Sequence, residues 1–285
     1  MLASFGAALA LLNVRSFPYL ALISLPATLE NFGTFKSNFW IKILILITIP
    51  LLLYESFFYL NGDYYKFTAS DAEPKLEFRE SGGKALDFVL DNELPPPIFN
   101  NFDIGSYITY RAWPKYRVFV DGRPGEYPKE FFQNVYIPVQ YDPVKFKELE
   151  EKVGFKTIIF SHTDQTPWGK AFLTQIVKNN EWRIVYIDDF MIVLLKDDYL
   201  ASQVFDPEAQ TRRGVPMETI DLSKLDPSVY SFDSYFPYLR LAVFLTQTGN
   251  LESAQKFAQK GLSLFPKSPL GNALFGINTK NNFFW

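Results

Sequence analysis

The apolar residues of this chain are most concentrated in its first 60 positions. Residues 39–60 read FWIKILILITIPLLLYESFFYL, and residues 43–53 carry no charge. About 20 predominantly apolar residues are enough to cross the hydrocarbon core of a bilayer. We therefore predict a membrane helix over residues 39–60, kinked at Pro50, with Glu55 near the interface or facing protein or water.

Residues 2–29 are also apolar, but Arg15 interrupts them. The run before Asn13 is too short to span a bilayer, and the segment lacks the positively charged start of a secretory signal. The pattern is typical of the end of one helix, a short turn, and a second helix that begins at Pro18. This second segment, 18–33, is short for a membrane span, and the alternative is that it lies in the interface. We expect residues 1–60 to be the last helices of a polytopic bundle in the cell membrane, and the chain to begin inside a longer protein.

Helical and β patterns alternate between residues 81 and 200, after a polar linker at 61–80. The predicted helices cover 84–94, 103–110, 128–136, 143–153 and 167–179. The predicted strands cover 98–100, 116–120, 156–160, 182–187 and 190–195. Asp188-Asp189 separates the last two strands and predicts a tight antiparallel hairpin. The order of these elements predicts an α/β domain with a mixed sheet.

A different helical pattern follows a second linker at 201–234. Residues 235–268 resemble one tetratricopeptide repeat, with residues of the expected kind at Tyr238, Leu241, Ala242, Gly249, Ala254 and Pro266. Ala258 and Gly261 depart from the pattern in ways expected to weaken the packing. Because a solenoid needs about three repeats, we expect the helical segment 235–285 to pack on the α/β domain or to begin a longer array. Its groove is a possible docking site for a protein partner.

Composition narrows the possible chemistry. The 285 residues include no cysteine and one histidine, and the net charge is -3. These values exclude disulfides and thiolate metal sites and argue against a nucleic-acid partner. The sequence lacks a P-loop, a G-x-G-x-x-G fingerprint, an H-E-x-x-H motif and an EF-hand loop, so we expect neither a cofactor nor a metal site.

The stretch 98–127 places several polar side chains around the ends of two predicted strands. They are Asp103, Arg111, Asp121, Arg123 and Tyr127. Ligand sites of open α/β sheets often lie beyond the carboxyl ends of strands, and Arg beside Asp and Tyr suits a sugar or a phosphate. Each residue also has a structural explanation: a helix N-cap at Asp103, a turn at Asp121-Gly122, and an ion pair made by Arg123.

Two further groups of residues contain catalytic residue types without a catalytic arrangement. Ser161, His162 and Asp164 match a catalytic triad only in composition, because neighbours in sequence rarely provide its geometry and no nucleophile elbow is present. The pairs Asp188-Asp189 and Asp197-Asp198 are expected to mark a turn and a strand exit. Paired carboxylates of a glycoside hydrolase remain an alternative that nothing in the sequence positions.

The segment FNNFDIGSYITYRAWPKYRVFVDGRPGEY resembles the C-terminal domain of GT-C-type polytopic membrane glycosyltransferases, a mannosyltransferase-like group. The matching positions are Asn100, Asn101, Asp103, Gly105, Tyr107, Arg111, Pro114, Asp121, Gly122, Arg123 and Tyr127, whereas Ser106 replaces a glycine. The turn at 13–18 and the hairpin with Trp182, Tyr186 and Asp188 are similar to segments of the same group. The resemblance covers roughly residues 10–196.

This resemblance implies transfer of a sugar from a polyprenyl-phosphate donor and an extracytoplasmic position for the α/β domain. It implies that the acidic catalytic residues lie in early loops that precede the positions of this chain, so no catalytic residue can be assigned here. Arg15 is a candidate contact for the lipid phosphate or, alternatively, a turn arginine that reaches the membrane surface.

Two interpretations of function follow. In the first, the chain is the C-terminal portion of a membrane glycosyltransferase-like protein that uses a lipid-linked sugar, and it is inactive alone. In the second, it is a non-enzymatic, membrane-anchored module that binds a protein or a glycan. Both predict a lipid bilayer as one partner.

Overall fold

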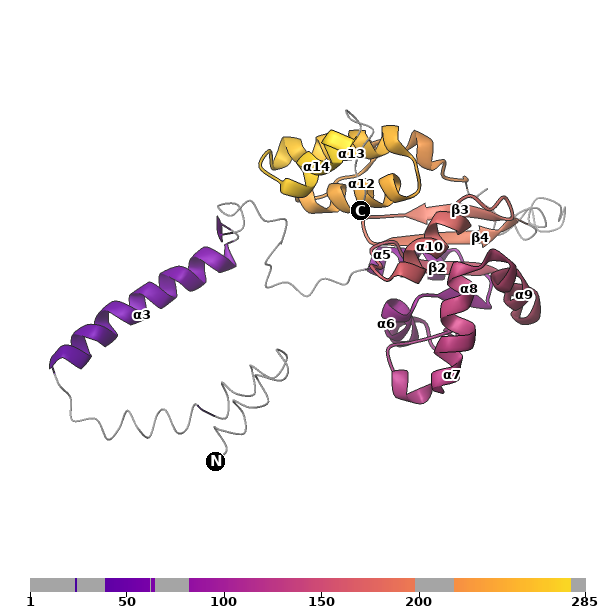
Figure 1. Ribbon diagram of the computed structural model, residues 1–285, viewed down its shortest axis with the longest axis horizontal. Coiled ribbons are helices and arrows are strands. Elements are labelled where there is room, and N and C mark those ends of the chain that lie inside the picture. Colours follow the sequence, from indigo (N-terminus) through magenta and orange to yellow (C-terminus); the bar gives the residue numbers. More distant parts are fainter. Residues whose placement is uncertain (1–23, 25–38, 62, 65–81, 198–217, 278–285) are drawn as a thin grey trace. The chain divides into compact units, whose positions relative to one another are not determined.

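The computed structural model of the chain describes residues 24, 39–61, 63–64, 82–197 and 218–277 (Figure 1). The chain forms two compact units, residues 1–64 and residues 65–285.

The first unit contains one long helix, α3 (Phe39–Leu60), with Pro50 inside it. No helix in the described ranges combines the length and the apolar character needed to cross a bilayer. The predicted membrane span at 39–60 is therefore wrong, although a helix does form there. The uncharged run between Lys42 and Glu55 is shorter than the roughly 20 apolar residues that a bilayer requires. The membrane helices predicted before residue 39 lie almost wholly outside the described residues.

The second unit is built on a four-stranded mixed sheet. Its strands are β1 (Ile98–Asn100), β2 (Thr157–Ser161), β3 (Trp182–Ile187) and β4 (Met191–Lys196), in the order β1-β2-β4-β3. β1 and β2 run parallel, whereas β4 is antiparallel to both β2 and β3. Asp188 closes the predicted hairpin, because its Oδ1 accepts hydrogen bonds from the backbone N–H groups of Phe190 (2.8 Å) and Met191 (2.7 Å).

The strand predicted at 116–120 does not form. The side chain of Asn100 occupies the position of a partner strand: its Oδ1 accepts from the N–H of Phe119 (2.8 Å) and its Nδ2 donates to the carbonyl of Val120 (2.7 Å). The apolar pattern of this segment therefore reflects its burial beside the end of β1. Its backbone is hydrogen-bonded to the Asn100 side-chain amide and not to a neighbouring strand.

Helices cover both faces of the sheet. In the α/β part they are α5 (Gly83–Asp91), α6 (Phe102–Ala112), α7 (Lys129–Phe131), α8 (Ile137–Tyr141), α9 (Pro143–Val153) and α10 (Pro167–Ile176). A π-helical turn at Phe132–Tyr136 joins α7 to α8. The C-terminal helices are α12 (Tyr235–Gln247), α13 (Leu251–Leu264) and α14 (Pro269–Ile277).

The two faces of the sheet support separate cores. Successive residues of a strand point to opposite faces, so Ile158 and Phe160 lie on one face and Ile159 lies on the other. α5 and α6 pack on the Ile159 face. α9, α10, α12 and α13 pack on the Ile158 face. Both faces are thus buried, as the continuous apolar strands require.

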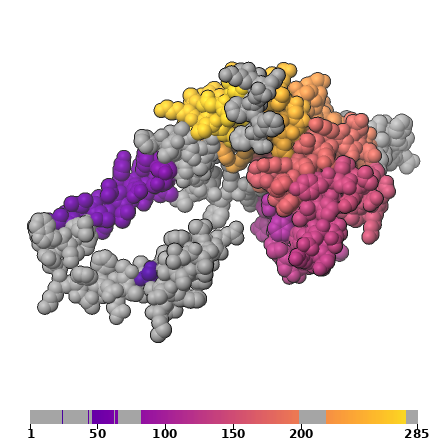
Figure 2. Space-filling view, viewed as in Figure 1, coloured from indigo at the N-terminus to yellow at the C-terminus, as the bar shows by residue number. Residues whose placement is uncertain are grey.

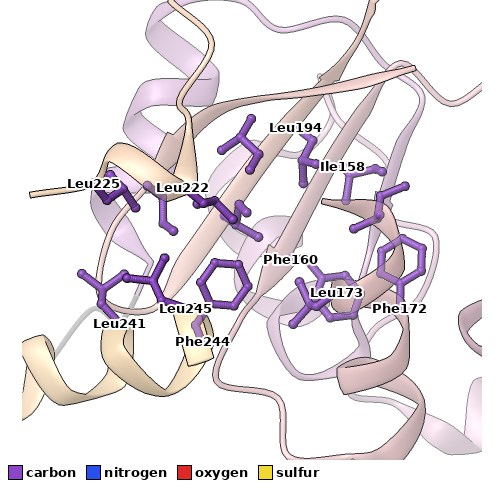
Figure 3. Close-up of a cluster of buried hydrophobic side chains, with 14 of the residues drawn as sticks. Ile158, Phe160, Phe172, Leu173, Leu194, Leu222, Leu225, Leu241, Phe244 and Leu245 are labelled. Atoms are coloured by element: carbon purple, nitrogen blue, oxygen red, sulfur yellow. The ribbon is translucent and has the colours of Figure 1, made fainter. Parts of the chain in front are cut away.

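The tetratricopeptide-like helices share the core of the sheet. Phe244 and Leu245 of α12 lie in the same apolar cluster as Phe160 and Leu173 (Figure 3). Figure 2 shows the C-terminal helices, coloured orange to yellow, directly against the strand region. The apolar face of α12 is therefore buried in the core of the second unit.

Gly261, which departs from the repeat pattern, has a packing role. A Cβ at this position would lie 2.6 Å from Cδ2 of Leu239. The missing side chain therefore leaves room for Leu239 of α12, so α13 packs closely where the sequence predicted a weakened contact.

Candidate functional site

A pocket of about 280 Å³ lies where the chain leaves β1 and β2. The two strands are parallel, so their carboxyl ends meet at one edge of the sheet. Phe102 and Asp103 follow β1, whereas Asp164, Thr166 and Trp168 follow β2. The remaining lining residues are Pro124, Phe132, Tyr136 and Ile137. This is the position that ligands usually take in open α/β sheets.

The first carboxylate of the pocket comes from the first turn of α6. Asn101, in an extended conformation, is the N-cap residue, so Asp103 is inside the helix instead of capping it as the sequence predicted. The Asp103 side chain is accessible to solvent. Partial burial, and then the negative charge of Asp164, raise the pKa of Asp103 above its ordinary value. The two carboxylates are therefore close enough to repel each other.

The second carboxylate is held in place from three sides. Asp164 is only 5% exposed. Its Oδ2 accepts a hydrogen bond from Nδ2 of Asn101 (3.2 Å), and its Oδ1 accepts from the N–H of Thr166 (2.8 Å). A Cβ at Gly169 would lie 2.6 Å from Cγ of Asp164, so only glycine leaves room for the carboxylate against the first turn of α10.

Asn101 connects the ends of the two strands. Its Oδ1 accepts from the N–H of Ser161 (3.0 Å) at the end of β2, while its Nδ2 donates to Asp164. One buried amide therefore fixes the loop after β1 to the loop after β2. It aligns the backbone segments that carry Asp103 and Asp164.

Four aromatic side chains form much of the pocket wall: Phe102, Phe132, Tyr136 and Trp168. Phe132 meets Phe102 and Tyr136 edge to face, each with 5.9 Å between ring centroids. The Tyr136 hydroxyl accepts from the N–H of Phe102 (2.8 Å). Burial, with smaller contributions from both carboxylates, raises the pKa of Tyr136, so this hydroxyl is neutral at physiological pH.

The 121–127 loop forms a structural wall beside the pocket. The buried carboxylate of Asp121 accepts several hydrogen bonds from the Arg123 guanidinium, the shortest 2.6 Å from Nη2, and these bonds lower the pKa of Asp121. The Tyr127 hydroxyl accepts from the N–H of Asp121 (3.1 Å). Only Pro124 of this loop lines the pocket. The guanidinium is therefore bound to the loop itself.

A close backbone approach explains one glycine of the 98–127 segment, Gly105. A Cβ at Gly105 would lie 1.9 Å from the carbonyl oxygen of Val120. The backbone of α6 thus touches the backbone of the 120–121 segment, and Gly122 N–H donates to Ser106 Oγ (3.1 Å) beside it. This contact holds the loop against the helix that carries Asp103.

The other predicted site residues lie elsewhere. Arg111, in the last turn of α6, forms an ion pair with Asp87 (2.6 Å) and donates to the Tyr107 hydroxyl (2.9 Å). Arg15 lies outside the described residues. The structure therefore brings together Asp121, Arg123 and Tyr127, places Asp103 in the neighbouring pocket, and leaves Arg111 at the opposite end of its helix.

His162 and Ser161 make contacts that differ from those of a catalytic triad. Nε2 of His162 lies 2.8 Å from the carbonyl oxygen of Asp188, and the ring packs on Phe244. The Ser161 hydroxyl instead bonds with Thr163 and with the carbonyl of Phe190. Burial lowers the pKa of His162 below its ordinary value. This histidine is a neutral core residue between the sheet and α12.

Sequence reasoning did not assign Asp164 or Trp168 to a ligand site. The available signal was the position of both residues directly after a buried strand. That signal becomes useful only when β2 is known to lie parallel to β1, because the pairing brings Asp164 to the edge that carries Asp103.

Within the described ranges, no group of three or more His, Cys, Asp or Glu residues comes together to hold a metal ion. No family model, curated protein or solved structure matches this chain. The pocket itself combines two carboxylates with four aromatic side chains.

Proposed function

We propose that the second unit is a carbohydrate-binding module and that the Asp103–Asp164 pocket is its sugar site. The observation that supports this proposal is the combination of two carboxylates and four aromatic side chains around one pocket. Its volume of about 280 Å³ is close to the lower limit of ordinary ligand pockets, which suits a single sugar ring.

The chemistry of a sugar ring matches both parts of the wall. The ring presents apolar C–H groups on one face, and these pack on the flat surface of an aromatic side chain. Its hydroxyl groups donate hydrogen bonds, and ionised carboxylates are the strongest acceptors in proteins. Trp168 is partly exposed, so it can contact a ring that enters from solvent.

The binding arrangement is also pre-formed. Asp164 is fixed by Asn101 and Thr166, and the Tyr136 ring is fixed by its hydrogen bond from Phe102. These two side chains therefore have little conformational entropy left to lose when a ligand binds. The resemblance to GT-C glycosyltransferases stays a prediction, and it supports the same class of ligand. We propose binding and not transfer, because the resemblance locates the catalytic residues outside this chain.

A glycan array probed with the full-length chain tests the proposal. We expect binding to a restricted set of glycans, followed by loss of at least tenfold in affinity in the Asp103→Asn and Trp168→Ala variants. The matched controls are Glu252→Gln, which neutralises an exposed carboxylate on α13, and Trp113→Ala, which removes an exposed indole that does not line the pocket. Equal loss in the controls, or no glycan binding by the wild-type chain, would overturn the proposal.

A further inference from the structure

The charge of the pocket selects among carbohydrates. Its lining includes two carboxylates, Asp103 and Asp164, and among the described residues no lysine, arginine or histidine lines it. The adjoining 121–127 loop carries one positively charged side chain, Arg123. Its guanidinium is hydrogen-bonded to Asp121. The pocket is therefore negatively charged.

In the described part of the chain, the hydrogen bonds to the pocket carboxylates bring no positive charge. Asp164 receives hydrogen bonds from neutral donors, the Asn101 amide and the Thr166 N–H. Asp103 is disfavoured as an anion by partial burial and by Asp164. A ligand that brings a positive charge would relieve this repulsion, whereas a phosphate would increase it.

The aromatic wall favours the same kind of ligand. An ammonium group is attracted to the electron-rich face of an aromatic ring, most strongly to Trp and Tyr. Trp168 and Tyr136 line the same pocket as the two carboxylates. A cation is thus attracted by rings and by anions at once, while a neutral sugar gains only stacking and ordinary hydrogen bonds.

We infer that the ligand of this pocket is an amino sugar with a free, protonated amine, bound with its ammonium group against Asp103 and Asp164. The inference rests on the proposed carbohydrate-binding function and specifies its ligand. It excludes a sugar phosphate, including the phosphate of a lipid-linked donor, as the group that the carboxylates recognise.

Three glycans with the same backbone test the inference. They are β-1,4-linked oligomers of glucosamine, N-acetylglucosamine and glucose, matched in length, which differ only at the second carbon of each ring. Isothermal titration calorimetry with the full-length chain, at a pH at which the amine is protonated, measures each affinity. We expect the glucosamine oligomer to bind at least tenfold more tightly than the other two, with a preference that weakens as salt is added.

Two variants separate the pocket from general attraction to a negatively charged chain. Asp103→Asn should remove most of the preference for the amine, whereas Glu252→Gln should leave it unchanged. Equal affinities for the three oligomers would overturn the amino-sugar inference while leaving the proposed function intact. The inference would also be overturned if Asp103→Asn bound the glucosamine oligomer with the same affinity as the wild-type chain. No binding of any oligomer, together with an empty glycan array, would overturn the proposed function itself.

Discussion

The side-chain amide of Asn101 donates a hydrogen bond of 3.2 Å to the carboxylate of Asp164, which lies 63 positions later in the chain. The same amide accepts from the N–H of Ser161 (3.0 Å). Asn101 thereby joins the loops that follow the two parallel strands, and both loops contribute a carboxylate to the pocket. The pocket therefore depends on a residue that does not line it.

Replacing Asn101 by alanine should weaken both the fold and the site. The Asn101→Ala variant leaves the Asp164 carboxylate and the Ser161 N–H without this buried partner, at an expected cost of about 2 to 4 kcal/mol in the free energy of unfolding. Urea unfolding followed by tryptophan fluorescence measures the loss. Asn92→Ala, which removes an exposed amide bonded to the carbonyl of Phe88, is the control and should cost less than about 1 kcal/mol. Equal losses would contradict the bridging role.

Gly105 should not tolerate a larger side chain. In Gly105→Ala the new methyl group would lie 1.9 Å from the carbonyl oxygen of Val120, so the helix or the loop must move. We expect a loss of about 3 kcal/mol or more, or failure to fold. Gly125→Ala is the matched control, because a Cβ there would meet nothing within 4 Å. Similar melting temperatures for the two variants would show that the contact does not constrain the backbone.

Stability should fall as the pH drops below the ordinary histidine pKa of 6.5. The folded state depresses the pKa of His162, so the unfolded chain binds a proton that the folded chain resists, and the free energy of unfolding decreases with falling pH. Nδ1 of His162 has no hydrogen-bond partner among the described residues, and protonation would bury a donor there. Asp188, Asp189 and Arg240 are the charged residues around the ring.

The chain contains one histidine, so the effect can be isolated. Thermal unfolding between pH 7.5 and pH 5.5 should show a decline in the wild-type chain and a smaller decline in His162→Phe, whose ring can still pack on Phe244. An identical pH dependence in the two proteins would assign the decline to other groups.

The buried ion pair between Lys196 and Glu150 should matter more than an exposed one. Lys196 is bonded to the Glu150 carboxylate, and their side chains are 12% and 4% exposed. Lys196→Ala leaves a buried carboxylate with weaker compensation from Lys147 at 3.7 Å, so we expect a loss of about 3 kcal/mol in the free energy of unfolding. The exposed pair of Glu252 and Lys256 is the control, and Lys256→Ala should change stability little. A comparable loss in both variants would contradict this account.

Local sequence patterns predicted much of the α/β fold. The apolar runs that became β2 and β4 are buried on both faces, and the polar pair after β3 formed the turn that its chemistry predicts. The pattern at 116–120 failed because its partner is the side chain of Asn100, which no periodicity reveals. The prediction of a membrane span at 39–60 was wrong. It counted all the apolar residues of the segment, although the uncharged run ends at Lys42 on one side and at Glu55 on the other.

The site was only half predictable. The composition of the 98–127 stretch made Asp103 a candidate ligand-binding residue, and Asp103 does line the pocket. Asp164 and Trp168 come from a second segment that is brought to Asp103 only by the parallel pairing of β1 and β2. Arg123 looked like an anion-binding residue, but a neighbour two positions away binds its guanidinium. Partners distant in sequence therefore decided the site.

A crystal structure of the chain with the tightest-binding glycan from the array would show directly where the ligand lies. We expect a sugar ring in the pocket, packed on Trp168, with hydrogen bonds from the sugar to Asp103 and Asp164. A glycan bound at another surface, with this pocket empty, would contradict it.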